Sequence, residues 1–134
     1  MYKIFNCIVA GIILTMMVSF REFSSLKGTW QYAGGIYNGR KEGPPVGYTL
    51  QRKYDDRHYE AFATDSTNHP EKYEAGDYLL KGDNCVETET FSSQPSKLMG
   101  IPVSYLYSVK NDTLTLKATL PSGMIVEEYW KRSK

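Results

Sequence analysis

Cysteine and histidine are scarce in this chain. Its 134 residues include two cysteines, Cys7 and Cys85, and two histidines, His58 and His69. Cys7 lies in an apolar N-terminal run, so Cys85 has no disulfide partner once that run is removed. Neither histidine has another histidine or a cysteine at the spacing of a zinc site, and we therefore expect no bound metal. We interpret Cys85 as a small, buried apolar residue.

An excess of charge of one sign is also lacking. Beyond residue 25, basic and acidic residues are equal in number. A domain near neutrality has no electrostatic reason to bind nucleic acid or an anionic membrane surface. Neither is expected as a partner, and we expect the chain to be a monomer.

Motifs of enzyme chemistry are missing as well. The sequence has no G-x-S-x-G elbow, no phosphate-binding glycine loop and no Cys–His pair. Glu87 and Glu89 share a strand face and would suit a carboxylate pair, yet alternating Glu and Thr is typical of the solvent side of a strand. His58 is interpreted as a solvated strand residue. We expect no enzyme and no cofactor, and a catalytic barrel that uses Glu87 or His58 is the third of three hypotheses.

A long apolar run is present at the N-terminus. Residues 4–20 read IFNCIVAGIILTMMVSF, with Lys3 before them and no acidic residue until Glu22. This is the layout of a signal peptide, while a membrane span needs roughly 20 apolar residues. Residues 1–25 are therefore predicted to be a signal peptide or, if they are not cleaved, an N-terminal anchor. In either case we expect an exported protein that touches a membrane only through this segment.

Strand signals fill residues 26–134, which are predicted to form one domain. Two-residue turns such as Asn111-Asp112 separate alternating segments, and Gly34-Gly35 indicates a bulge or bend in the first strand. One short helical turn is predicted at 93–98, with Pro95 in its first turn and Gly100 just beyond it. The predicted strands are 28–37, 46–54, 57–64, 72–81, 84–91, 102–110, 113–120 and 124–132.

These eight strands are joined by short turns, which place each strand antiparallel beside the one before it. An up-and-down meander of eight strands can close into a barrel and so remove its exposed edges. The fold class is therefore predicted to be all-β, an eight-stranded antiparallel barrel. The alternative is a two-sheet sandwich, which needs longer crossing connections than these turns provide.

The two ends of the domain carry a resemblance to a known family. The sequence Gly-Thr-Trp at 28–30 and the sequence Trp-Lys-Arg at 130–132, on either side of a meander, resemble the lipocalin and fatty-acid-binding-protein superfamily, also called calycins. The likeness is closest to small exported bacterial lipocalin-like proteins of unassigned function, which implies a periplasmic or secreted location. In the superfamily an arginine of the last strand covers a tryptophan of the first strand at the closed end of the barrel. The resemblance implies this structural role for Trp30 and Arg132.

The chain lacks the helices that cover or flank the barrel in the superfamily. Only residues 38–45 join the first two predicted strands, so the helix-turn-helix that covers the mouth of fatty-acid-binding proteins is missing. The long helix that lipocalins pack against the barrel wall is missing too.

The inward face of the barrel is the candidate site. Aromatic residues fall on the more apolar register of their strands, and buried phenol groups need hydrogen-bonding partners, which Arg52, Glu89, Glu128 and Arg132 would supply together with Glu87. The first hypothesis is a small, largely apolar ligand inside the barrel, and the second is a protein-interaction module with a filled core. A void of about 300 Å³ or more favours the ligand. The candidate cavity residues are Tyr48, Leu50, Tyr59, Tyr73, Glu87, Tyr105, Tyr107 and Trp130.

Overall fold

Nine β-strands build the part of the chain that the computed structural model describes, residues 25–134. The signal peptide or anchor predicted for residues 1–25 lies, except for Ser25, outside the described residues. No helix in the described part is long and apolar enough to cross a membrane. The strands are β1 (Gly28–Tyr37), β2 (Arg40–Glu42), β3 (Tyr48–Tyr54), β4 (His58–Asp65), β5 (Pro70–Lys81), β6 (Asn84–Ser92), β7 (Pro102–Lys110), β8 (Thr113–Thr119) and β9 (Ile125–Arg132).

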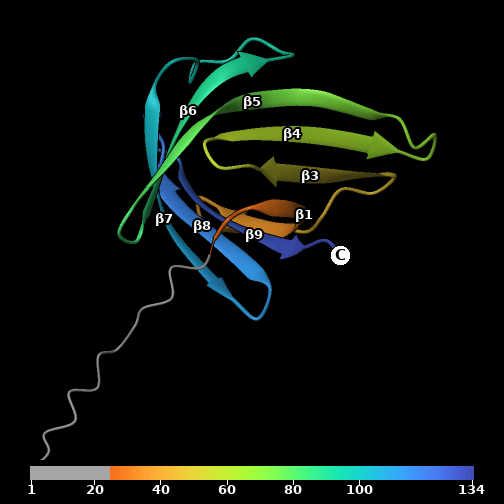
Figure 1. Cartoon of the computed structure of the whole chain (residues 1–134), viewed down its shortest axis with the longest axis horizontal. Helices are drawn as coiled ribbons and strands as arrows, with labels where there is room; N and C mark the ends of the chain where they lie inside the picture. Colours follow the sequence, from red (N-terminus) through yellow and green to blue (C-terminus); the bar gives the residue numbers. More distant parts are fainter. Residues whose placement is uncertain (1–24) are drawn as a thin grey trace, which may run out of the picture.

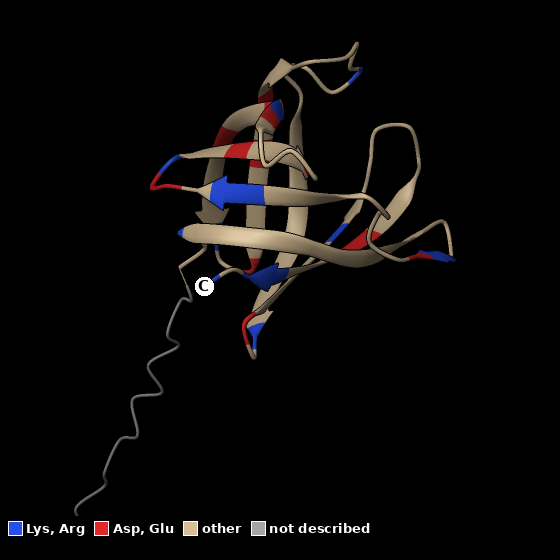
Figure 2. Ribbon diagram, turned by 90° about the vertical axis from the view of Figure 1, so that its right-hand side faces the viewer, with Lys and Arg blue, Asp and Glu red and all other residues tan. Residues whose placement is uncertain are grey.

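The sheet closes on itself because its first and last long strands pair. From β3 onward each strand lies antiparallel beside the next, and β1 pairs with β3 on one side and with β9 on the other. Figure 1 shows β1, β8 and β9 packed side by side across from β4 and β5. The predicted eight-stranded up-and-down barrel is confirmed, and the sandwich alternative is wrong. Basic and acidic residues are dispersed over strands and turns alike (Figure 2).

A ninth, short strand is not predicted by the sequence pattern. Pro44 and Pro45 are expected to keep the chain from pairing until residue 46, but β2 folds back on β1 with Gly35 opposite Glu42. Asn38 and Gly39 form the turn with φ values of 50° and 82°, which is the conformation that Asn-Gly favours in two-residue hairpins. The first half of β1 therefore pairs with β3 and its last residues pair with β2.

The helical turn predicted at 93–98 is wrong. These residues form bends without a helix. Serine side chains bind the local backbone instead: the Ser92 hydroxyl donates to the carbonyl of Gln94 at 2.7 Å, and the Leu98 amide donates to the Ser96 hydroxyl at 3.1 Å. Such local bonds compete with helical ones, and Pro95 has no amide proton to contribute.

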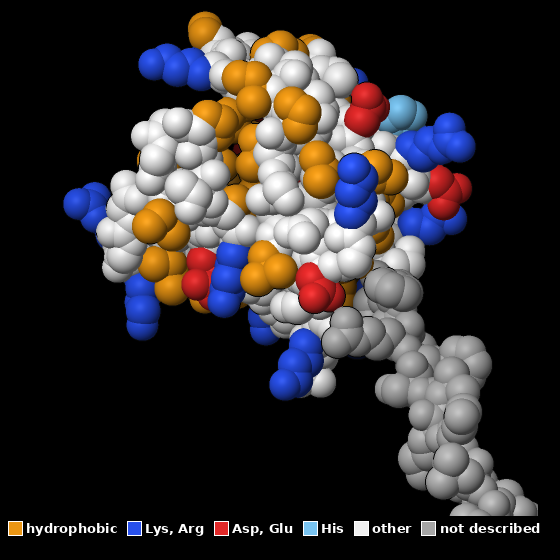
Figure 3. Space-filling model, turned by 90° about the vertical axis from the view of Figure 1, so that its left-hand side faces the viewer, with side chains coloured by type: hydrophobic (Ala, Val, Ile, Leu, Met, Phe, Trp, Pro, Cys, Tyr) orange, Lys and Arg blue, Asp and Glu red, His pale blue; other side chains and the backbone are white. Residues whose placement is uncertain are grey.

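The wall of the barrel has a seam between β6 and β7. These strands pair only from Asn84 opposite Leu106 to Thr88 opposite Pro102. Beyond Thr88 the segment 93–101 lies against β6, where Glu89 forms a parallel bridge with Met99. Figure 3 views this side of the molecule and shows a narrow hollow among hydrophobic side chains, with most charged side chains at the margin.

One end of the barrel is filled by a packed core. Trp30 is fully buried, and its indole nitrogen donates to the carbonyl of Leu26 at 2.9 Å. The guanidinium carbon of Arg132 lies 4.2 Å from the centroid of the Trp30 ring, and its Nη1 donates to the carbonyl of Lys27 at 3.1 Å. The structure thus brings together the two residues expected to close this end. Cys85 is buried in the same core, as expected.

Candidate ligand-binding cavity

A cavity of about 480 Å³ lies inside the barrel where β1 ends and β3 begins, which is the end opposite Trp30. Five of the eight predicted cavity residues line it, namely Tyr48, Leu50, Tyr73, Tyr105 and Trp130. The remaining lining residues are Tyr32, Tyr37, Glu42, Gly43, Pro45, Arg52, Glu74, Glu89, Leu98 and Glu128.

The other three predicted residues lie elsewhere. Tyr59 and Glu87 border a separate void of about 10 Å³, which is the size of one water molecule. Tyr107 lines neither space and packs, half-buried, against the core cluster. The structure therefore places Tyr59 and Glu87 beside the cavity and Tyr107 away from it.

Two tyrosines of the lining, Tyr32 and Tyr37, were missed by sequence reasoning. They are separated by an odd number of positions, so strict strand alternation would put them on opposite faces. A register shift between Tyr32 and Gly34 brings both to the inner side, and their hydroxyls lie 2.7 Å apart. Gly35 allows this, because a Cβ there would lie 3.0 Å from both tyrosine side chains. The glycine pair at 34–35 was the available signal, since it indicates a bulge.

A buried ion pair, Arg52 with Glu87, stands at the inner end of the cavity. Arg52 Nη2 donates to Glu87, whose other carboxylate oxygen accepts from the Tyr54 hydroxyl at 2.8 Å. Burial is the largest influence on the pKa of Arg52 and acts to lower it, but the acidic groups around the guanidinium, Glu87 first among them, together raise the pKa above its usual value. The guanidinium carbon lies 4.5 Å from the centroid of the Tyr59 ring and 5.5 Å from that of the Trp130 ring. Arg52 is therefore held in one place as a cation.

Three further carboxyl groups lie on the inner wall. Glu74 accepts from the Tyr59 hydroxyl at 3.0 Å, and Glu128 accepts from the Tyr37 hydroxyl at 2.9 Å. Burial raises the pKa of Glu128 and of Glu89, and Glu74 raises that of Glu89 further. The interpretation of the Glu and Thr pattern in β6 as a solvent-facing side is wrong for Glu87 and Glu89, which are buried. In residues 25–134 no three side chains of the metal-binding types gather into a metal site.

Three residues of the cavity lining also carry buried polar atoms that have no hydrogen-bonding partner among the described residues. In the described part of the chain three buried side-chain atoms have no hydrogen-bonding partner, and they are Arg52 Nε, Trp130 Nε1 and Glu89 Oε1. All three residues line the cavity. Arg52 Nε and Trp130 Nε1 carry protons and are donors.

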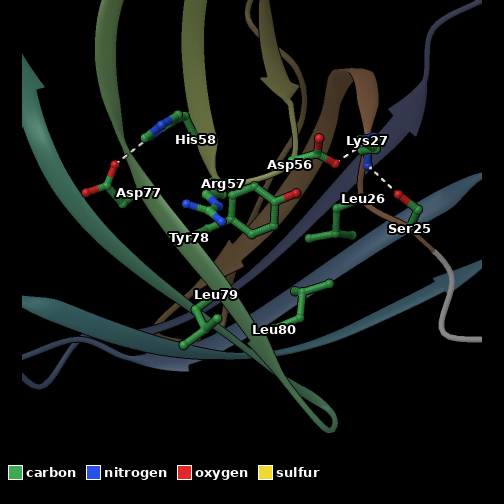
Figure 4. Close-up of a pocket in the computed structure, with 10 residues that line it drawn as sticks. All are labelled: Ser25, Leu26, Lys27, Asp56, Arg57, His58, Asp77, Tyr78, Leu79 and Leu80. Atoms are coloured by element: carbon green, nitrogen blue, oxygen red, sulfur yellow. Dashed lines mark hydrogen bonds and ion pairs between the residues drawn. The ribbon is translucent and has the colours of Figure 1, made fainter.

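A larger depression of about 780 Å³ lies at the other end of the barrel, outside its interior (Figure 4). Four of its ionisable side chains form two pairs: Lys27 binds Asp56 at 2.6 Å and His58 binds Asp77 at 2.6 Å. No predicted cavity residue lines it. His58, the base of the catalytic hypothesis, is exposed here and lies apart from the cavity lining.

Comparison with known proteins supports the fold. No protein-family model matches the sequence, and no curated protein matches it. A lipocalin-like protein from Bacteroides uniformis is 16% identical and superposes with a TM-score of 0.57 over 81% of this chain and 98% of its own. An uncharacterized protein from Bacteroides eggerthii is 12% identical, with a TM-score of 0.61 over 81% of this chain and 100% of its own. At these identities the likeness establishes a shared fold, the lipocalin-like barrel.

Proposed function

Starting from a lipocalin-like barrel with a cavity inside it, we propose that this protein is a carrier that binds one small, largely apolar molecule. The observation that carries the proposal is the cavity volume of about 480 Å³. Ligand sites of small molecules begin at about 300 Å³. A cavity of this size lies within the range of about 300–1,000 Å³ that drug-sized ligands occupy.

The lining combines polar and apolar surface, and its apolar part supports this choice of ligand. Tyr32, Tyr73, Tyr105 and Trp130 supply ring surfaces, and Leu50 adds an aliphatic one. Sites for small molecules are mostly apolar, and a few fixed polar groups orient the ligand. The buried Arg52 is such a group, since Glu87 and the surrounding rings hold it in place.

The alternative was a protein-interaction module with a filled core. The cavity weighs against it, because a filled core leaves no space of this size. The proposal contains no catalytic step: His58 is exposed and bonded to Asp77, while the Glu87 carboxylate is bonded to Arg52 and Tyr54. Binding and release of the ligand are the whole of the proposed activity.

We also propose that the protein acts after export, in the periplasm or outside the cell. The support is the sequence of residues 1–25, in which a basic residue precedes an apolar run of signal-peptide length. Mass spectrometry of the protein purified from the culture medium and from cell fractions tests this. A mass that still includes residues 1–25 would favour the anchor instead.

Binding is tested with an uncharged fluorescent probe, phenylnaphthylamine. We expect one probe per chain and a loss of about tenfold or more in affinity in Leu50→Trp, because the larger ring fills the cavity. Lys53→Trp is the matched control: it adds the same ring on the same strand at an exposed position, so its affinity should equal that of the wild type. Absence of probe binding in the wild type, together with no co-purifying molecule in native mass spectrometry, would refute the carrier function.

A further inference from the structure

In residues 25–134 three carboxyl groups of the inner wall have no positively charged partner. Glu74, Glu89 and Glu128 line the cavity, and none of them forms an ion pair with a lysine, arginine or histidine of the described chain. The one basic residue of the lining, Arg52, is paired with Glu87. Charged groups inside a protein are normally paired or bind a metal ion, so the missing counter-charge calls for a physical explanation.

Glu128 is accessible from the cavity. It stands directly opposite Leu116 of β8, which is fully buried, so both side chains point into the barrel. Glu128 is only half-buried, and the space that it lines on this side of the sheet is the cavity. Its Oε2 accepts from the Tyr37 hydroxyl at 2.9 Å. No hydrogen bond within the described chain uses Oε1, and Oε1 is not one of the three fully buried atoms without a partner, so a ligand can reach it.

The protons of the neighbouring phenol groups are already in use. Tyr37 donates its one proton to Glu128, so in the 2.7 Å contact between the two hydroxyls Tyr32 is the donor. Tyr59 likewise donates to Glu74. An ionised carboxylate can accept about four hydrogen bonds, so Glu128 keeps free acceptor capacity that the surrounding tyrosines do not fill. What this wall lacks is a group that brings protons and positive charge.

We propose that the ligand carries an ammonium group and that this group binds Glu128 from within the cavity. The inference rests on the proposed carrier function and narrows its ligand class to amines with an apolar body. Aromatic faces attract cations as well, and Tyr32, Tyr37 and Tyr105 line the same space.

The surroundings of Glu128 favour a cation beside it. Burial raises the pKa of Glu128, and the charges of Glu87 on β6 and Glu74 on β5 raise it further. Arg52 on β3 and the hydroxyl of Tyr37 on β1 act in the opposite direction. The empty cavity therefore favours a proton on Glu128, and an ammonium group that binds there takes the place of this proton.

The position of Arg52 sets the orientation of the ligand. From the closed end toward the mouth, β9 presents Arg132, then Trp130, then Glu128, and the guanidinium carbon of Arg52 lies 5.5 Å from the centroid of the Trp130 ring. The positive charge of Arg52 repels an ammonium group from this inner end. We therefore expect the ammonium group on the mouth side, at Glu128, and the apolar body against Trp130.

An anionic ligand does not fit these surroundings. It would add a negative charge to a wall on which three carboxyl groups already lack counter-ions among the described residues. Like charges repel strongly where water is excluded. A wholly apolar ligand would leave Oε1 of Glu128 without a partner in a cavity from which it has displaced water.

Three naphthalene derivatives with the same substitution site test the inference by titration calorimetry on the full protein at neutral pH: the aminomethyl, the ethyl and the carboxylate derivative. We expect the amine to bind about tenfold or more tightly than the ethyl derivative, which is the effect of one hydrogen bond between charged groups, and the carboxylate to bind most weakly. The formal net charge of the chain is +1, so a general attraction of cations does not account for such a preference.

The outcome for the carrier function is read separately. If phenylnaphthylamine binds but the amine binds no more tightly than the ethyl derivative or the carboxylate, the inference is overturned and the carrier function stands. If neither phenylnaphthylamine nor any of the three compounds binds, both fall.

A variant assigns the preference to one carboxylate. Glu128→Gln keeps the shape of the side chain and an acceptor for the Tyr37 hydroxyl but removes the charge, so affinity for the amine should fall about tenfold while affinity for the ethyl derivative stays close to that of the wild type. Glu127→Gln is the matched control, because Glu127 is the next residue of β9, is paired with Lys117 at 3.5 Å and does not line the cavity. An amine preference that survives in Glu128→Gln would overturn the inference.

The wild-type protein provides a second readout that needs no variant. In a nuclear Overhauser spectrum of the amine complex, the methylene protons beside the ammonium group should lie close to the ring protons of Tyr37, and the naphthalene protons close to the indole of Trp130. Trp30, the other tryptophan of the chain, should show no contact with the ligand. Methylene contacts to Trp130 without contacts to Tyr37 would contradict the inference.

Discussion

The buried pair of Arg52 and Glu87 gives the sharpest test of how the interior is held together. In Glu87→Gln the side chain keeps its shape and one acceptor oxygen but loses its charge. The side chains of Arg52 and Glu87 are 6% and 4% exposed, so the arginine would stay buried without its counter-ion. The Tyr54 hydroxyl, which donates to Glu87 at 2.8 Å in the wild type, would still find an acceptor in the amide oxygen of the new side chain.

The expected magnitude follows from this burial. Removal of one partner of a buried ion pair costs about 3–5 kcal/mol, and a small domain has a free energy of unfolding of about 5–15 kcal/mol. The double variant Arg52→Met with Glu87→Gln removes both charges and keeps the Tyr54 bond. Replacement of a whole buried pair is often nearly neutral, so we expect the double variant to lie within about 1.5 kcal/mol of the wild type.

Urea unfolding followed by tryptophan fluorescence measures all of these free energies, provided that the slope with urea is the same in each variant. Arg52→Met alone completes the double-mutant cycle. A loss of less than about 1 kcal/mol in Glu87→Gln would refute the reasoning. It would mean that another carboxylate of the inner wall, such as Glu74, balances the charge of Arg52.

Three further predictions concern other parts of the barrel. Arg132→Ala should lower the free energy of unfolding by about 1–2 kcal/mol, because a ring loses its cation and its cover. Gly76→Ala should lower it by about 1–3 kcal/mol or more, since the new Cβ would press on the backbone of β6 and lie 2.8 Å from a tyrosine ring. Burial raises the pKa of Glu128 above the ordinary 4.5. Between the pKa of the unfolded state and the higher pKa of the folded state, Glu128 holds a proton when folded and releases it on unfolding. The free energy of unfolding therefore falls as pH rises through this interval, and Glu128→Gln should flatten this fall.

Each of these has its own check. Thermal unfolding compares Arg132→Ala with Lys131→Ala, an exposed neighbour expected to change little, and equal effects would argue against the tryptophan contact. Gly43→Ala is the reference for Gly76→Ala, because a Cβ at Gly43 meets nothing within 4 Å. For Glu128→Gln, urea midpoints between about pH 5 and about pH 8 suffice, and a profile parallel to that of the wild type would contradict the prediction.

Strand alternation predicted the inner wall well where the strand is regular. In β7 the residues expected on one face, Val103, Tyr105 and Tyr107, are buried or half-buried, and Ser104 and Leu106 are exposed. Pairing of β7 with β8 runs without a register shift, so the period of two holds along the strand.

Alternation failed in β5, where register shifts interrupt the pairing with both neighbours. Strict alternation would place Asp77 and Leu79 on one face with Tyr73, which lines the cavity. Instead Asp77 and Leu79 are exposed, while Tyr78 and Leu80 are half-buried. One extra residue exchanges the two faces of a strand. Because the shift depends on the neighbouring strands, the sequence of β5 alone does not reveal it.

The burial of the charged residues in the site could not be predicted from the pattern of one strand, for a related reason. Glu87 and Glu89 alternate with threonines, as solvent-facing residues do, but both are buried. The group that makes burial of Glu87 tolerable is Arg52, which comes from β3 on another part of the barrel. Which charged residues pair across a closed sheet depends on how the strands are arranged in space. The sequence of a single strand therefore does not predict such a pair.

The pairing of β1 with β9 also governs how the chain reaches its fold. It joins Tyr32 to Trp130, so the contacts that close the barrel connect opposite ends of the described chain. Closing so long a loop costs entropy before any pairing compensates for it, and folds rich in distant contacts assemble slowly. Until β9 pairs with both of them, β1 and β8 each keep an open edge, and a chain that lacks its final residues has no complete wall around the cavity.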